Sequence, residues 1–177
     1  GLAGLLFVLG IGVRLLDLPD PPLDFHAWRQ LRSATIARGM YSQMARGLAP
    51  EDRQLAENLG RQCEKLEPPI FERFVALTYL ALGREVLWVS RLYSTFFWAV
   101  GGAALYALAR RLATPGGAAL PLGFYMLLPF GVIASRSFLP DPLMGMWLLI
   151  AAYLLYRWSE RPTWALASSS RSAASSF

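Results

Sequence analysis

The sequence predicts an all-α membrane protein with about four transmembrane helices and a long extracytoplasmic first loop. Composition is the first observation: 55% of the 177 residues are hydrophobic and 16% are charged, whereas soluble domains have roughly 45–50% and about 25%. Second, the apolar residues are collected into four long runs. Third, the net charge of +5 comes almost wholly from Arg at the ends of these runs and in one mixed-charge segment. A nucleic-acid-binding protein would gather its basic residues on one polar surface, so we expect no nucleic-acid partner.

The four apolar runs are the predicted membrane spans. The first has about 15 residues and is interrupted by Arg14. Because about 20 residues cross a bilayer, we expect this helix to begin before the sequence given. It lacks the basic leader and the small-residue cleavage site of a signal peptide. Pro and Gly in the later runs are tolerated where neighbouring groups satisfy the freed carbonyls. The predicted spans are residues 2–16, 87–109, 112–134 and 142–156.

Basic residues predict the orientation of the spans. Arg110 and Arg111 follow the second run, and Arg157 and Arg161 follow the fourth. Arg near short loops marks the cytoplasmic side. Residues 17–86, together with the short loop before the fourth run, then face outward. We therefore expect a multi-pass protein of a bacterial plasma membrane with its polar site on the outer face.

The outer segment, residues 17–86, is predicted to contain helices at the membrane interface. Apolar residues recur near helical spacing from Trp28 onward with Arg between them, which is typical of an amphipathic helix. Residues 51–67 are helical in composition or a loop, and residues 70–83 are apolar but too short to span. Cys63 is the single cysteine, so the chain forms no internal disulfide. Residues 1–166 form the predicted membrane module, and residues 167–177 are a low-complexity tail.

Asp24 is the candidate catalytic residue. It follows Pro19, Pro21 and Pro22, which stiffen the exit from the first run. A carboxylate held at the membrane surface can act as a general base toward a hydroxyl or an amine. The alternative is that Asp24 is the N-cap of the helix that follows, and both readings stay open.

Two further polar groups belong to the outer segment. His26 and Arg29 are three residues apart and share a helix face. Arg29 is a candidate phosphate ligand, although an arginine among lipid headgroups is equally consistent with the pattern. Glu67 precedes Pro68 and Pro69, which direct its side chain, or it belongs to a simple turn. A divalent metal there would need further ligands beside His26, so no metal ligand is assigned and no cofactor is expected, with a divalent metal kept as an open alternative.

Arg136 and Asp141 lie in the short loop between the third and fourth runs. Ionisable residues so close to the hydrocarbon are costly and commonly functional. A snorkelling Arg and an Asp that starts the next helix before Pro142 are the alternative. Arg91, at the start of the second run, faces the same side. Together these groups suit a ligand with a lipid tail and a phosphate.

The order of "PDPPLDFHAWRQ", "EPPIFE" and "SRSFLPDPLM" resembles the N-terminal part of the GT-C membrane glycosyltransferases. It is closest to the glycosyltransferase 39 group, with the protein O-mannosyltransferases and the aminoarabinose transferases. The resemblance implies that Asp24 is the catalytic base and that Arg136 contacts the donor phosphate. Phe25 stands where many relatives have a second acidic residue. Relatives carry many more helices, so we expect this chain to be a fragment without much of the donor cavity.

The function expected from this resemblance is transfer of a sugar from a polyprenyl-phosphate donor to a lipid, glycan or protein acceptor, with inversion at the anomeric carbon. A transporter subunit and a non-catalytic membrane scaffold remain as alternatives. A transporter would carry charges near the bilayer centre, where these spans have none. A scaffold would keep its function when Asp24 becomes Asn. The candidate site residues are the catalytic Asp24, the phosphate-binding Arg136, Arg29 and Arg91, and the substrate-binding His26, Glu67 and Asp141.

Overall fold

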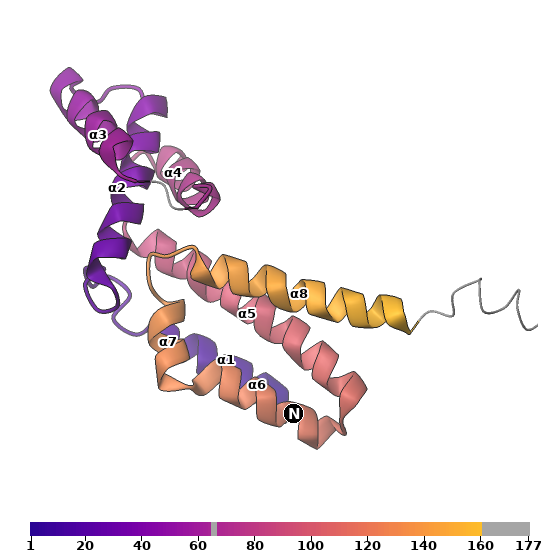
Figure 1. The fold of residues 1–177 in the computed structure, drawn as a ribbon. Coiled ribbons are helices and arrows are strands. Elements are labelled where there is room, and N and C mark those ends of the chain that lie inside the picture. Colours follow the sequence, from indigo (N-terminus) through magenta and orange to yellow (C-terminus); the bar gives the residue numbers. More distant parts are fainter. Residues whose placement is uncertain (65–66, 161–177) are drawn as a thin grey trace, which may run out of the picture.

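The computed structural model describes residues 1–64 and 67–160, and this part of the chain is entirely helical apart from its connections (Figure 1). The predicted all-α class is therefore confirmed for these residues. The predicted tail, residues 167–177, lies outside them. The helices are α1 (Leu2–Leu15), α2 (Ala27–Met44), α3 (Pro50–Gln62), α4 (Ile70–Leu82), α5 (Trp88–Leu112), α6 (Pro115–Leu127), α7 (Pro129–Ser135) and α8 (Asp141–Ser159).

The helices form two groups. Helices α1, α5, α6 and α8 run alongside one another as a bundle, and α2, α3 and α4 gather at one end of it (Figure 1). Within the bundle, α5 packs against both α8 and α6, and α6 packs against α1. Gly101 permits the close approach, because a Cβ atom there would lie 2.7 Å from the hydroxyl oxygen of Tyr125. The bundle is thus built around α5.

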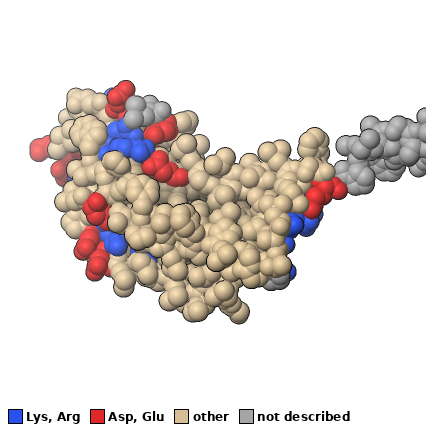
Figure 2. Space-filling view, turned by 60° about the horizontal axis from the view of Figure 1, so that its bottom comes forward, with Lys and Arg blue, Asp and Glu red and all other residues tan. Residues whose placement is uncertain are grey.

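The surface of the bundle is apolar between two charged ends. On the face shown in Figure 2, acidic and basic side chains gather at the ends of the molecule and the surface between them shows none. At the end away from α2–α4, Arg111 of α5 pairs with Glu160 at 2.6 Å. Large apolar side chains point outward along the bundle, including Phe124, Trp147 and Leu148. Exposed apolar surface of this extent marks contact with a partner or a membrane.

The predicted spans are matched only in part. Among the described residues, α5 has the length and apolar composition to cross a membrane, and the bent pair α6–α7 joins it if the pair counts as one span. Helix α1 is apolar but has 14 residues, and the 19-residue α8 does not reach the same hydropathy. Four spans therefore remain a prediction. The third predicted span, residues 112–134, is two helices that meet at 57°.

The break between α6 and α7 has an identifiable cause. Pro129 has no N–H group, so the carbonyl of Tyr125 loses its helical partner, and the Trp98 indole nitrogen donates to that carbonyl at 3.1 Å. Arg14, which is fully buried, donates to the Met126 carbonyl at 2.7 Å and to the Ser135 hydroxyl at 2.6 Å. Arg14 therefore fastens α1 to both sides of the break.

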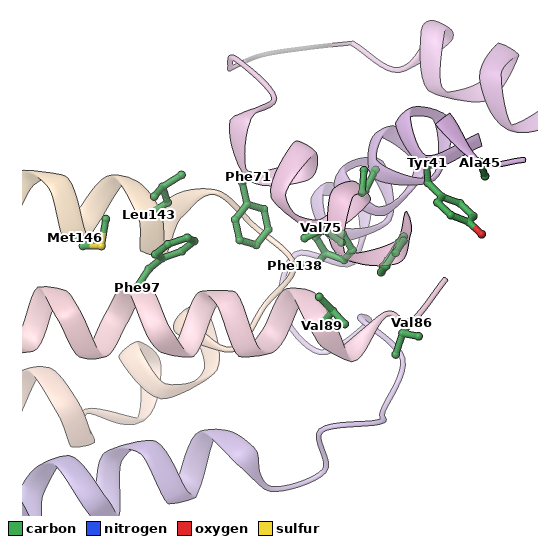
Figure 3. Close-up of a cluster of buried hydrophobic side chains, with 13 residues drawn as sticks. Tyr41, Ala45, Phe71, Val75, Val86, Val89, Phe97, Phe138, Leu143 and Met146 are labelled. Carbon is green, nitrogen blue, oxygen red and sulfur yellow. The ribbon is translucent and has the colours of Figure 1, made fainter. Parts of the chain in front are cut away.

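An apolar core joins helices α2 and α4 to the bundle. Phe71 and Val75 of α4 pack beside Phe97 of α5 and Phe138 of the α7–α8 loop (Figure 3). The Phe71 ring meets Phe138 edge to face, with centroids 5.8 Å apart. The outer segment contains α2 and α4 where helices were expected, and α3 lies where the sequence allowed either a helix or a loop. Their location at a membrane interface stays a prediction.

Replacing Arg14 by Met should destabilise the fold. Met fills a similar volume but donates no hydrogen bond, so the Met126 carbonyl and the Ser135 hydroxyl lose their donor. Leaving a buried polar group unpaired costs about 1–3 kcal/mol, so we expect a loss of about 2 kcal/mol or more. Thermal unfolding in detergent measures this. The exposed Arg110→Met is the matched control, and equal stability of the two variants would contradict the assigned role.

Candidate functional site

Asp24 lies in the connection between α1 and α2. This connection is bracketed by two non-glycine residues in the left-handed region, Asp17 at φ 50° and His26 at φ 46°. Such residues cost free energy and persist where surrounding contacts hold them. Helix α2 begins at Ala27 with His26 as its N-cap and no side-chain capping bond. The reading of Asp24 as the N-cap is therefore wrong, because the turn at His26 separates Asp24 from the helix.

The Asp24 carboxylate is held on one side only. Its Oδ1 accepts a hydrogen bond from Gln30 Nε2 at 3.3 Å and lies 3.7 Å from Arg91 Nη2. In the described part of the chain no hydrogen bond reaches Oδ2, and the side chain is 39% exposed. One oxygen thus faces the protein and the other is free to meet an acceptor.

Arg91 and Arg136 bind the same stretch of backbone. Arg91, only 2% exposed, donates to the carbonyls of Asp17 at 2.8 Å and Pro21 at 3.2 Å. Arg136 Nη2 donates to the carbonyls of Leu16 at 2.8 Å and Asp17 at 3.3 Å. The Asp17 carbonyl oxygen therefore accepts a hydrogen bond from each of the two arginines. We call Asp24, Arg91 and Arg136 the exit cluster, because they surround the chain as it leaves α1.

Arg136 has a buried guanidinium nitrogen, Nε, without a hydrogen-bond partner in the described part of the chain. Buried donors are nearly always paired in folded proteins, so an unpaired one calls for an explanation. The Nε atoms of Arg32 and Arg53 are in the same state.

A second group of charges lies on the outer side of α2. Arg29 binds both carboxylate oxygens of Asp141 at 3.2 Å and Glu67 at 3.4 Å. Arg32 also binds Glu67, at 3.3 Å. These four residues form what we call the outer network, which ties α2 to the start of α4 and of α8. Arg29 is thereby engaged by two carboxylates, and Asp141 is the first residue of α8, as its alternative reading stated.

An apolar groove adjoins the outer network. It has a volume of about 590 Å³, lies between α4, α5 and α8, and has Glu67 at its rim. Phe74, Phe97 and Trp147 are among its lining side chains. Such a groove beside charged groups suits a molecule with an alkyl chain and a polar head.

Glu72 is a buried ionisable residue near Glu67 and Arg32 that the sequence analysis missed. It is 5% exposed, and burial raises the pKa of its carboxyl above the ordinary value of 4.5. The negative charge of Glu67 raises this pKa further, whereas Arg32 lowers it. The signal was present in the sequence, because Glu72 lies at helical spacing with the buried Val75, Ala76 and Tyr79.

His26 stands apart from both groups. Its exposed ring lies edge to face with Phe25, with centroids 4.5 Å apart. Across residues 1–64 and 67–160, no three His, Cys, Asp or Glu side chains come together in a way that would hold a metal ion. The substrate-binding role of His26 stays a prediction.

These features define an all-helical protein whose polar site lies at one end of an apolar helix bundle. The family model for dolichyl-phosphate-mannose-protein mannosyltransferases matches residues 67–173, which is more than half of the chain. The chain belongs to this family and is a membrane glycosyltransferase of the GT-C type. The matched residues include Glu67, Arg91, Arg136 and Asp141, whereas Asp24 precedes them. Neither a curated protein nor a solved structure matches the chain.

Glu72 predicts a pH dependence of stability. Its pKa in the folded state lies above the ordinary value of 4.5, so the folded protein binds this proton more tightly than the unfolded chain. The free energy of unfolding then falls as the pH rises from about 4.5 through the folded-state pKa. Glu72→Gln should remove this fall and raise the free energy of unfolding at neutral pH. Unfolding measured from about pH 4 to about pH 8 tests this.

The matched control for this prediction is Glu64→Gln, because Glu64 is exposed. It should leave the pH dependence of the parent unchanged. An unaltered pH dependence in Glu72→Gln would show that another group causes it.

Proposed function

We propose that the chain forms the acceptor-activating part of an enzyme that transfers a sugar from a polyprenyl-phosphate donor to an acceptor on the extracytoplasmic face. The exit cluster carries this proposal. Asp24, whose Oδ2 accepts no hydrogen bond from the described residues, and Arg136, with a buried unpaired guanidinium nitrogen, both lie at the backbone that leaves α1. A base and an anion ligand are the two groups that such a transfer requires.

The chemistry follows from these two groups. An acceptor hydroxyl or amine attacks the anomeric carbon of the sugar while Asp24 takes its proton through Oδ2. The bond between the anomeric carbon and the phosphate oxygen breaks, and the polyprenyl phosphate leaves with the electron pair. Attack opposite the leaving group inverts the anomeric carbon. Arg136 stabilises the charge that develops on the phosphate.

The three arginines proposed to bind the phosphate differ in how far their guanidinium groups are already engaged by acceptors of the protein. Arg29 is held by Asp141 and Glu67, and Arg91 is turned toward backbone carbonyls and Asp24. Among these three, Arg136 is the one whose Nε is both buried and without a hydrogen-bond partner in the described part of the chain. Arg136 is thus the principal phosphate ligand, and Arg29 and Arg91 add positive charge while they hold the site together.

The remaining features fit the same substrate. The apolar groove beside Glu67 has room for part of a lipid chain. Asp141 and Glu67 of the outer network, and separately the exposed His26, are the groups proposed to meet hydroxyl groups of the sugar or of a glycan, lipid or protein acceptor. The opposite end of the bundle carries Arg110, Arg111 and Arg157, which favours the cytoplasmic side for that end.

Asp24→Asn should lower sugar transfer at least about 100-fold, because general-base catalysis contributes about 10²- to 10⁴-fold. Arg136→Gln should lower it by a comparable factor. The assay expresses the full open reading frame in membranes and follows labelled sugar from dolichyl-phosphate mannose and other polyprenyl-phosphate sugars into acceptors.

The matched controls are Asp20→Asn and Arg84→Gln, both at exposed positions outside the exit cluster. They should retain transfer. Full transfer by Asp24→Asn would refute the assignment of the base and favour a scaffold role for the outer segment.

A further inference from the structure

Gln30 links the two segments that carry the proposed catalytic groups. It lies in the first turns of α2, and its side chain is completely buried. Its Nε2 donates to the Phe25 carbonyl at 2.6 Å and to Asp24 Oδ1 at 3.3 Å. Its Oε1 accepts from the backbone N–H of Phe138 at 2.8 Å. Phe138 follows Arg136 by two residues, so one amide contacts both halves of the site.

The partners of Gln30 determine how its amide is turned. The Phe138 N–H can only donate, so the oxygen of the amide must face it. The Phe25 carbonyl can only accept, so the amide nitrogen must face Asp24 and Phe25. A flipped amide would place donor against donor and acceptor against acceptor. The hydrogen bond to Asp24 Oδ1 therefore follows from the contact that the same amide makes with Phe138 in the α7–α8 connection.

We infer that Gln30 is a positioning residue that turns Asp24 Oδ1 inward, leaves Oδ2 for the acceptor, and sets Asp24 in register with the segment of Arg136. The inference rests on the proposed function, because it gives Asp24 the role of base. Gln30 itself is buried and acts through Asp24, without touching substrate. Neither the family match, which begins at residue 67, nor the candidate residues of the sequence analysis include it.

Besides Gln30, charged groups also lie near Asp24 and act on its carboxylate. Arg91 lies 3.7 Å away and is itself within the electrostatic reach of Asp17, Asp20 and Arg136. His26 is two residues along the chain and exposed. Gln30 adds a neutral donor to these charged neighbours, and it is the group that approaches Oδ1 most closely.

Two substitutions separate positioning from support of the fold. Gln30→Glu keeps the shape and can still accept from Phe138, but it places a second carboxyl beside Asp24. Gln30→Leu removes the donor and the acceptor together. Loss of a donor to a carboxylate disfavours the ionised form, as does a neighbouring negative charge. The acidic limb of the rate profile should therefore move to higher pH in both variants, by about one unit.

The test is sugar transfer by the full open reading frame in membranes, with dolichyl-phosphate mannose as donor, measured against pH. We expect kcat of Gln30→Glu to fall about 10-fold at neutral pH with little change in KM for the donor. Gln43→Glu and Gln43→Leu are matched controls, because Gln43 is exposed on the same helix. They should keep the parental kcat and pH profile.

The outcomes distinguish this inference from the proposed function. If Asp24→Asn abolishes transfer and Gln30→Glu keeps the parental kcat and pH profile, the role of Gln30 is refuted and the proposed base stands. A lower yield of folded protein with an unmoved pH profile in both Gln30 variants would also refute it, because it shows structural support alone. Retained transfer by Asp24→Asn would overturn both.

Discussion

The structure depends on one constraint: backbone carbonyl groups at the breaks of the apolar helices must find donors inside the protein. Three arginines meet it. Arg14 donates at the α6–α7 break, and Arg91 and Arg136 donate at the exit from α1. In a hydrocarbon surrounding, no water is present to replace these contacts. Each arginine carries several donors in one planar group, so one side chain holds two or more carbonyls at a fixed geometry.

The same constraint places the proposed catalytic groups. Arg91 and Arg136 share the carbonyl of Asp17, a residue in the left-handed region, and this fixes the path of the chain toward Asp24. Arg136 uses Nη2 for this purpose and keeps Nε unpaired. Arg136 thus holds the backbone at the exit from α1 and also carries the group proposed to bind the phosphate. The substitution Arg136→Gln tests both together, whereas Asp24→Asn removes the proposed base and its charge beside Arg91 but no hydrogen bond to a backbone carbonyl.

The sequence predicted the helices better than it predicted their ends and partners. Apolar runs and helical spacing depend on nearby residues, so α2, α4 and α5 were expected close to where they lie. The break at Pro129 was not expected, because a proline in an apolar run is tolerated or not according to distant groups, here Trp98 and Arg14. Arg29 was predicted as a phosphate ligand, but its partners Glu67 and Asp141 are brought to it only by folding. Residue spacing along the chain cannot predict that side chains so far apart in the sequence come into contact.

Neighbouring residues of α2 serve the two polar groups of the site separately. Gln30 contacts the exit cluster by its hydrogen bond to Asp24. Arg29 belongs to the outer network by its ion pairs with Glu67 and Asp141. Their partners on the other side, Phe138 and Asp141, belong to the α7–α8 connection and the start of α8. The first turn of α2 is therefore fastened to one segment at two points, so it cannot shift against Arg136 without losing both.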